Sequence, residues 1–227
     1  MARRRKPQST FQFPPGWGGA RPGSGPKPRG GRRGVRHRTR DRVDPHAPLH
    51  VTLRLRSGLP SLRRRRELAV VVEALAAGRE ADGFRLAQFS VQTNHLHLIV
   101  EADDARALTL GVQGLMIRIA KRLNAAWRRK GKVFADRYHA RALRSPREVR
   151  NALEYVLNNA VRHGARVPDG LPDPCSSGLW FDGWRGLRIA TSGPPPVASA
   201  RSWLLRVGWR RQGTIPPGEK RSIGRDR

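Results

Sequence analysis

The chain has 227 residues, a formal net charge of +29 and a sequence pI near 12. This length suits one well-packed core with tails and is short for two independent domains. The single cysteine, Cys175, excludes an internal disulfide and a multi-cysteine zinc site, and no apolar run approaches the ~20 residues that span a bilayer. The N-terminus lacks the apolar segment of a signal peptide, so we expect a cytoplasmic protein.

The positive charge predicts a polyanionic partner. Nucleic acid is the usual one, because every neutralised phosphate releases bound counterions. An arginine-favouring genome would account for part of the excess. It would not account for the small number of acidic residues, 17 Asp and Glu against 46 Lys and Arg.

Composition divides the chain into three regions. Residues 1–47 contain thirteen Lys and Arg and almost no apolar residues, which predicts a disordered basic arm. Residues 48–166 carry the periodic apolar patterns and form the predicted folded domain. Residues 167–227 form a basic C-terminal extension, and its tryptophans predict that it packs back on the core: Trp180, Trp184, Trp203 and Trp209.

Seven elements are predicted within the middle region, in the order β-α-β-β-α-β-α. They are strand 49–57, helix 62–77, strands 84–91 and 95–102, helix 108–130, strand 138–145, and a helix that runs from the N-cap Ser145 to Gly164. This order indicates an α+β fold, a ferredoxin-like split βαβ antiparallel sheet with helices on one face and an open second face. Such a layout indicates no activity by itself.

Strand 95–102 contains two histidines one residue apart. Side chains alternate across a strand, so His95 and His97 lie on the same face, opposite Leu96 and Leu98. Two neighbouring imidazoles suit a divalent ion but need a third ligand. The simpler alternative is a strand that tolerates two histidines.

The last helix places Tyr155 and Asn159 four residues apart, so they share one side of it, and Arg162 continues the same line. Tyr155 lies beside the apolar stripe of this helix rather than within it. The chain has only one other tyrosine, Tyr138, so the choice of a tyrosine nucleophile is narrow. The alternative for Tyr155 is an amphipathic residue at a helix–sheet seam.

Together these motifs resemble the REP-associated tyrosine transposases, within the single-tyrosine HUH transposase and nuclease superfamily. NHLHLIV matches the His-hydrophobic-His motif, and YVLNNAVRHG is similar to the helix that carries the nucleophile. Between them, GKVFADRYHARAL resembles a third segment of the family, and the likeness covers about residues 48–166. Ala160 stands where relatives usually have proline, which predicts a helix more continuous through Asn159.

The resemblance implies a metal-dependent DNA strand transferase with its site on the open face of the sheet. His95, His97 and Asn159 would hold Mg²⁺ or Mn²⁺, and Tyr155 would attack a phosphate to give a 5′-phosphotyrosine. The implied partner is single-stranded DNA beside palindromic hairpins, bound by a monomer or homodimer associated with the bacterial nucleoid. The candidate phosphate contacts are Arg32, Arg33, Arg36, Arg38, Arg40, Arg118, Arg122, Arg129 and Arg162.

Other interpretations remain open at this point. A basic, non-catalytic nucleic-acid-binding protein fits the composition equally well but leaves the joint presence of the histidines and the Tyr155–Asn159 pair unexplained. A metal-dependent nuclease that uses water would share the histidines and form no covalent adduct. The sequence does not separate a mobile-element enzyme from a domesticated relative, and each arginine could instead be a solvated charge.

Overall fold

The computed structural model describes residues 42–162, 167 and 170–218. Within them lies one five-stranded antiparallel sheet with the strand order β2-β3-β4-β1-β5. The strands are β1 Leu49–Arg54, β2 Glu80–Ala81, β3 Phe84–Val91, β4 His95–Ala102 and β5 His139–Ala142. The α+β fold class and the split βαβ arrangement are confirmed, and the two-residue β2 was not predicted.

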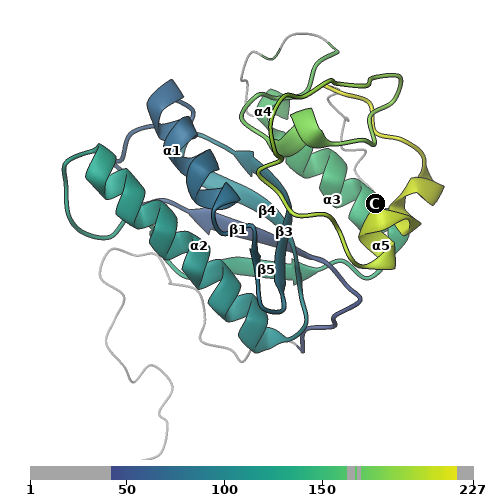
Figure 1. Ribbon diagram of the computed structural model, residues 1–227, viewed down its shortest axis with the longest axis horizontal. Coiled ribbons are helices and arrows are strands. Elements are labelled where there is room, and N and C mark those ends of the chain that lie inside the picture. The colour runs from purple at the N-terminus through teal and green to yellow at the C-terminus, as the bar shows by residue number, and fades with distance from the viewer. Residues whose placement is uncertain (1–41, 163–166, 168–169, 219–227) are drawn as a thin grey trace, which may run out of the picture. The chain divides into compact units, whose positions relative to one another are not determined.

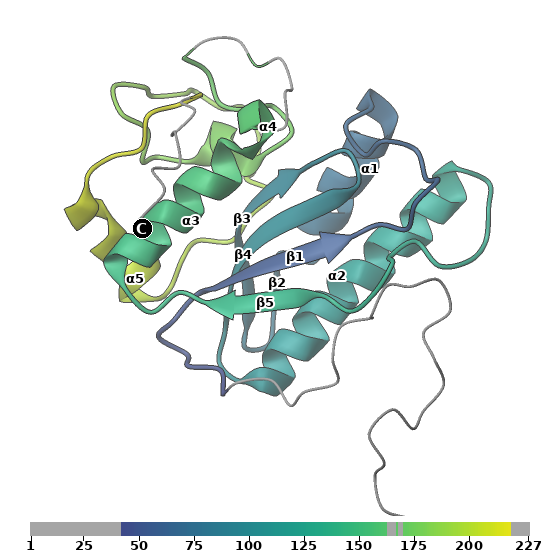
Figure 2. The same ribbon diagram turned by 180° about the vertical axis from the view of Figure 1, so that it is seen from behind.

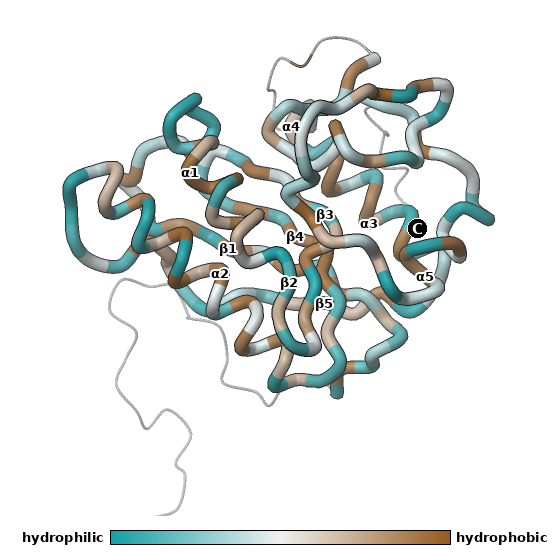
Figure 3. Tube along the Cα trace, viewed as in Figure 1, coloured by the Kyte–Doolittle hydropathy of each residue, from teal (hydrophilic) through white to brown (hydrophobic). Residues whose placement is uncertain are grey.

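Helices α1 (Arg65–Ala76) and α2 (Ala105–Ala126) lie together on one face of the sheet (Figures 1 and 2). Their apolar sides meet the inward residues of the central strands in the main core, and the hydrophobic segments gather along β3 and β4 (Figure 3). Gly111 of α2 lies so close to the ring of Phe84 that a Cβ atom would overlap it. None of the described helices is long and apolar enough to cross a membrane.

A β-bulge in β3 changes which residues face this core. The register to β4 shifts between Leu86 and Gln88, so one residue is extra on β3. Leu86 before the bulge and Phe89 after it can therefore both be buried in the main core, although they are three residues apart. Ala87 faces the opposite side, where it joins a second apolar cluster.

The second face is only partly open, which corrects the prediction that all helices lie on one face. Helix α3 (Pro146–Leu157) covers β3 and β4 there, together with the C-terminal extension. Trp209, 1 % exposed, and Phe181 pack against Leu153 and Ile99 in this cluster. The extension contributes three short elements: η1 (Ser177–Trp180), α5 (Trp203–Arg206) and η2 (Gly208–Gln212).

The extension also covers the outer edge of β3, which the short β2 leaves largely unpaired. Val91 N–H donates to the carbonyl of Cys175 at 2.8 Å, and Ala198 N–H donates to that of Leu86 at 2.8 Å. An exposed strand edge offers unpaired backbone groups to other chains, so this cover protects the sheet. The prediction that the tryptophan-containing extension packs on the core is confirmed for its described residues.

The last predicted helix is divided in two, which contradicts the expectation of a helix continuous through Asn159. Helix α3 ends at Leu157, and Asn158 leaves helical geometry with φ −101° and ψ 11°. The four-residue α4 (Asn159–Arg162) follows. The Asn158 side-chain amide contacts the extension at this break: it donates to the carbonyl of Pro216 at 3.0 Å and accepts from Gly218 N–H at 3.0 Å.

Candidate active site

The two predicted histidines and the predicted tyrosine lie together. They line one open cavity of about 480 Å³, on the part of the second face that α3 leaves uncovered. The rings of His95 and His97 have centroids 4.8 Å apart, and the ring of Tyr155 lies edge-on to that of His97 at 5.2 Å. The full lining is Thr52, Arg54, Gln92, Thr93, Asn94, His95, His97 and Tyr155.

Strand β1 supplies residues that orient His97. Thr52 pairs with His97 across the strands, and His50 is two residues before Thr52 on the same face. The Nε2 atom of His50 lies 3.1 Å from Nδ1 of His97, and the hydroxyl of Thr52 lies 3.3 Å from the same nitrogen. The Nδ1 side of His97 is thus engaged with His50 and Thr52, which orient the ring.

Burial keeps the His50 ring neutral. Desolvation, together with the nearby positive charge of Arg141 and with His139, lowers the pKa of His50 to about 4. A neutral imidazole retains one nitrogen that accepts a hydrogen bond. A His50 ring that accepts through Nε2 pairs with a His97 ring protonated on Nδ1.

Helix α3 brings Tyr155 to the histidines. The hydroxyl of Ser145 accepts a hydrogen bond from Glu148 N–H and caps the helix, with Pro146 in its first turn, as predicted. Hydrogen bonds from Arg144 N–H and then from Arg141 hold the pKa of Glu148 below its ordinary value. Arg150 fixes the helix to the extension by donating to the carbonyls at positions 213 and 214, both at 3.1 Å.

Asn159, the third predicted ligand, is fully buried but is not among the residues that line the cavity. Both polar atoms of its amide are buried without a hydrogen-bond partner among the described residues. An unsatisfied buried amide costs about 1–3 kcal/mol, so this amide needs an explanation. A ligand for its oxygen would provide one.

These donors fit a divalent cation in part. No three His, Cys, Asp or Glu side chains in the described portion of the chain gather to hold a metal. Two imidazoles therefore need a third donor of another kind, and the Asn159 amide oxygen is of the type that Mg²⁺ and Mn²⁺ accept. His95 is oriented by its neighbour, because its Nδ1 lies 2.9 Å from the side-chain oxygen of Asn94.

The three predicted arginines with described side chains, Arg118, Arg122 and Arg129, do not line this cavity. Arg118 lies against Gly78, and Arg122 forms a 3.1 Å salt bridge with Glu73, so both face α1 on the helical side of the sheet. Arg129 lines a separate basic cavity of about 740 Å³ with Arg66 and Arg128. The side chain of Arg162 lies outside what the structure describes. So do the five arginines of the basic arm: Arg32, Arg33, Arg36, Arg38 and Arg40.

Sequence reasoning missed His50, Thr52 and Arg54. Their alternation along LHVTLR was visible, and it placed all three on the polar face of a predicted strand. What it could not give was the pairing of β1 with β4, which sets Thr52 opposite His97 and Arg54 opposite His95.

Comparison with solved structures gives a structural likeness, whereas comparison with families and curated proteins gives none. No protein-family model matches the chain, and no curated protein matches it. The chain is similar to a solved structure described as "Structure of the REP associates tyrosine transposase bound to a REP hairpin", with 19% sequence identity and a TM-score of 0.48. The match covers 63% of this chain and 82% of that one.

Proposed function

We propose that this protein cleaves and rejoins single-stranded DNA through a covalent bond to Tyr155, as a metal-dependent strand transferase of the REP-associated tyrosine transposase type. One observation carries the proposal: a tyrosine from α3 lies against the His-hydrophobic-His pair of β4 in a single open cavity. If the two histidines were merely tolerated in the strand and Tyr155 merely filled a helix–sheet seam, there would be no reason for the tyrosine to lie beside the histidines.

His95, His97 and Asn159 would hold the Mg²⁺ or Mn²⁺. When bound, the ion would supply Lewis-acid stabilisation of the charge on the scissile phosphate. His50 and Thr52 would hold the His97 ring in one orientation, through the contacts to its Nδ1. Asn94 would do the same for His95. Arg54, exposed at the rim of the cavity, would bind a phosphate of the incoming strand.

Tyr155 would perform the covalent step. Its phenolic oxygen forms a bond to phosphorus, the bond from phosphorus to the 3′-oxygen breaks, and that oxygen takes up a proton to become a free 3′-OH. The DNA strand downstream then remains attached as a 5′-phosphotyrosine. Because the phosphodiester bond energy is kept, a second 3′-OH can attack the adduct and rejoin strands. The partly exposed ring of Tyr155 is reachable by a single strand at the open end of the cavity.

A covalent-trapping assay tests the proposal. The full chain is incubated with Mn²⁺ and labelled single strands from the DNA flanking its own gene, and the products are separated on a denaturing gel. We expect a labelled, protein-sized band that is lost in Tyr155→Phe and His97→Ala. Tyr138→Phe is the matched control, because that tyrosine is 5 % exposed and belongs to the main core on the helical face.

The other outcomes identify the rival functions. Cleavage without an adduct that persists in Tyr155→Phe would mean a nuclease that uses water. DNA binding with neither cleavage nor adduct, on a panel of hairpin-flanked strands, would mean a basic binding protein.

A further inference from the structure

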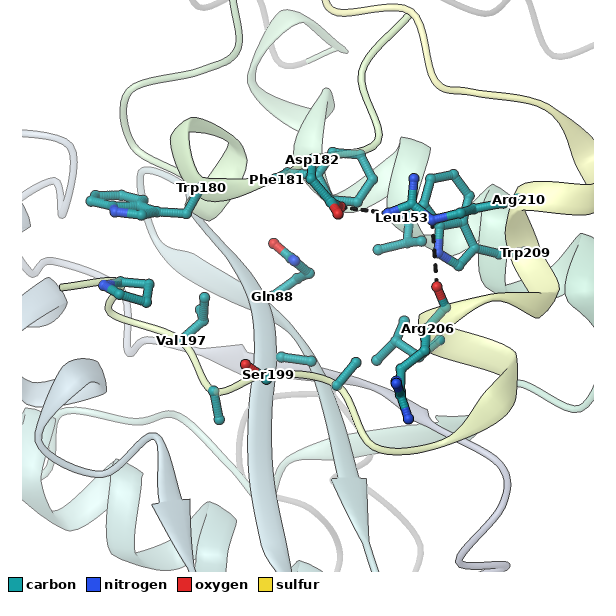
Figure 4. Close-up of a pocket in the computed structure, with 15 residues that line it drawn as sticks. Gln88, Leu153, Trp180, Phe181, Asp182, Val197, Ser199, Arg206, Trp209 and Arg210 are labelled. Atoms are coloured by element: carbon teal, nitrogen blue, oxygen red, sulfur yellow. Dashed lines mark hydrogen bonds and ion pairs between the residues drawn. The ribbon is translucent and has the colours of Figure 1, made fainter. Parts of the chain in front are cut away.

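A second cavity, of about 350 Å³, lies on the other side of α3 from the candidate active site. It is enclosed by β3, α3 and the C-terminal extension, and its volume is within the range of about 300–1,000 Å³ that small-molecule sites have. Figure 4 shows residues from all three elements around it, with Gln88 from β3, Leu153 from α3 and Val197, Ser199 and Trp209 from the extension. Nothing in the proposed chemistry uses this cavity.

Aromatic side chains form much of its wall. Phe181 and Trp209 stack with centroids 5.4 Å apart, and the guanidinium of Arg210 lies 4.7 Å over the Trp209 ring. Trp180 is partly exposed, and its indole N–H is buried without a hydrogen-bond partner among the described residues. Trp209 is buried against Phe181 and under Arg210, so Trp180 is the partly exposed aromatic side chain that a planar ring would contact, and base–aromatic stacking depends little on which base is present.

Gln88 adds a directed hydrogen-bonding group. The β3 bulge places it beside Ala87 on this side of the sheet, and its side-chain oxygen accepts from the hydroxyl of Ser177 at 2.6 Å. This bond fixes the amide and leaves its nitrogen to donate to a ligand. A planar, hydrogen-bonding ring has acceptors for such a donor, whereas a purely apolar molecule has none.

The rim of the cavity is basic. Arg206 is exposed there, and Arg210 is held by a 2.6 Å salt bridge to Asp182. The carboxylate neutralises Arg210, so Arg206 supplies the uncompensated positive charge at the entrance. A ligand with an apolar ring and an attached negative group matches both the wall and the rim, and a nucleotide of a DNA strand has this composition.

We propose that this cavity receives one unpaired base of the DNA strand that the active site acts on, with the adjoining phosphate at Arg206. The inference rests on the proposed function for the identity of the strand. The two sites share α3: Leu153 lines this cavity, and Tyr155, two residues later, lines the other. A strand that crosses α3 would thus have one base held at a fixed distance from the phosphate that Tyr155 attacks, which would set the position of cleavage.

Binding to chemically simple strands tests this without the natural target. The probes are fluorescent oligonucleotides dT, dA and dC of about 15 units, and a chain of abasic sugar phosphates of the same length, a size that ssDNA-binding folds accommodate. The proteins are the full chain, Ser199→Trp, which fills the cavity from its rim, and Ser192→Trp. Ser192 is an exposed serine of the same extension outside the cavity, so it is the matched control. Gln88→Leu provides a second variant that removes the donor with little change in volume.

We expect the unchanged protein to bind at least one base-containing strand about 5- to 150-fold more tightly than the abasic chain. Ser199→Trp should reduce this preference while retaining affinity for the abasic chain. Gln88→Leu should reduce the affinity for the preferred base. Ser192→Trp should keep the preference of the unchanged protein. Equal preference in Ser199→Trp and the unchanged protein, or no preference for any base, would overturn the inference.

Trapping and binding separate the two proposals. Suppose that the Tyr155 adduct forms and that Ser199→Trp leaves the base preference intact. That result would refute only the proposal that this cavity binds a base. Suppose instead that Ser199→Trp abolishes the base preference and that no strand gives an adduct. That result would refute only the proposed strand-transfer function. Binding of a free aromatic compound that does not compete with dT, dA or dC would assign the cavity to another ligand and overturn the inference.

Discussion

Nε2 of His50 lies 3.1 Å from Nδ1 of His97, which joins the first strand of the sheet to the candidate metal-binding strand across 47 residues of sequence. The contact gives His97 a fixed orientation before any ligand arrives. Groups that orient metal-binding histidines are often as important as the ligands themselves, because they set both the ring angle and the tautomer.

Replacing His50 should therefore weaken metal binding without removing a ligand. We expect His50→Phe to lower the affinity for Mn²⁺ by about 10- to 100-fold, the usual effect of losing such a partner. Mn²⁺ binding is measured by electron paramagnetic resonance of the free ion, which needs no DNA. His139→Phe is the control, because His139 is exposed on β5 and faces the same side of the sheet. Equal affinities in the two variants would contradict a positioning role for His50.

The C-terminal extension should be required for a stable fold. Trp209 is 1 % exposed and packs beside Leu153 on α3, so Trp209→Ala should lower the free energy of unfolding by about 3–5 kcal/mol. Trp203 is 48% exposed in the same extension, and its replacement by alanine should cost much less. Urea denaturation followed by circular dichroism measures both. A stable, active fragment of residues 48–166 after limited proteolysis would refute the requirement.

The ion pair of Arg63 and Asp173 should contribute more to stability than an exposed pair. Two hydrogen bonds of 2.8 Å join these side chains across 110 residues, and the Asp173 side chain is only 1% exposed. Removing Arg63 leaves a buried carboxylate without its partner, so Arg63→Ala should destabilise the fold by about 3–5 kcal/mol.

The exposed pair of Arg122 and Glu73 is the comparison for that variant, and Arg122→Ala should cost at most about 1 kcal/mol. A double-mutant cycle on each pair isolates the coupling. Equal coupling energies for the two pairs would show that burial of Asp173 does not strengthen its interaction with Arg63.

Cys175 should react slowly with alkylating reagents in the folded protein. Burial, and then the negative charge of Asp173, raise the pKa of its thiol above the ordinary value, while Arg63 lowers it in part. A raised pKa means a smaller thiolate fraction at every pH below it, and the thiolate is the reactive form. We expect iodoacetamide to modify the folded protein much more slowly than the urea-unfolded protein, with the onset displaced to higher pH. Similar rates in both states at pH 8 would contradict a buried thiol.

The sequence alone determined most of the elements of the middle region. Strands 84–91 and 95–102 were predicted with the bounds that the structure has, because their hydrophobic patterns lie between clear turn residues. The face of β4 that carries both histidines followed from the two-residue period of a strand. Ser145 and Pro146 marked the start of α3 for a local reason too, since a helix cap involves only neighbouring residues.

Only the tertiary structure decided how these elements meet. Strand pairing joins segments far apart in the chain, so neither the His50–His97 contact nor the cover of the β3 edge by the extension is encoded in any local pattern. The break after Leu157 likewise lies where the Asn158 side chain bonds to Pro216 and Gly218, some sixty residues later. Local periodicity reports each element's own preferences, whereas the packing of α3 and the position of Tyr155 depend on contacts that form only when the whole chain folds.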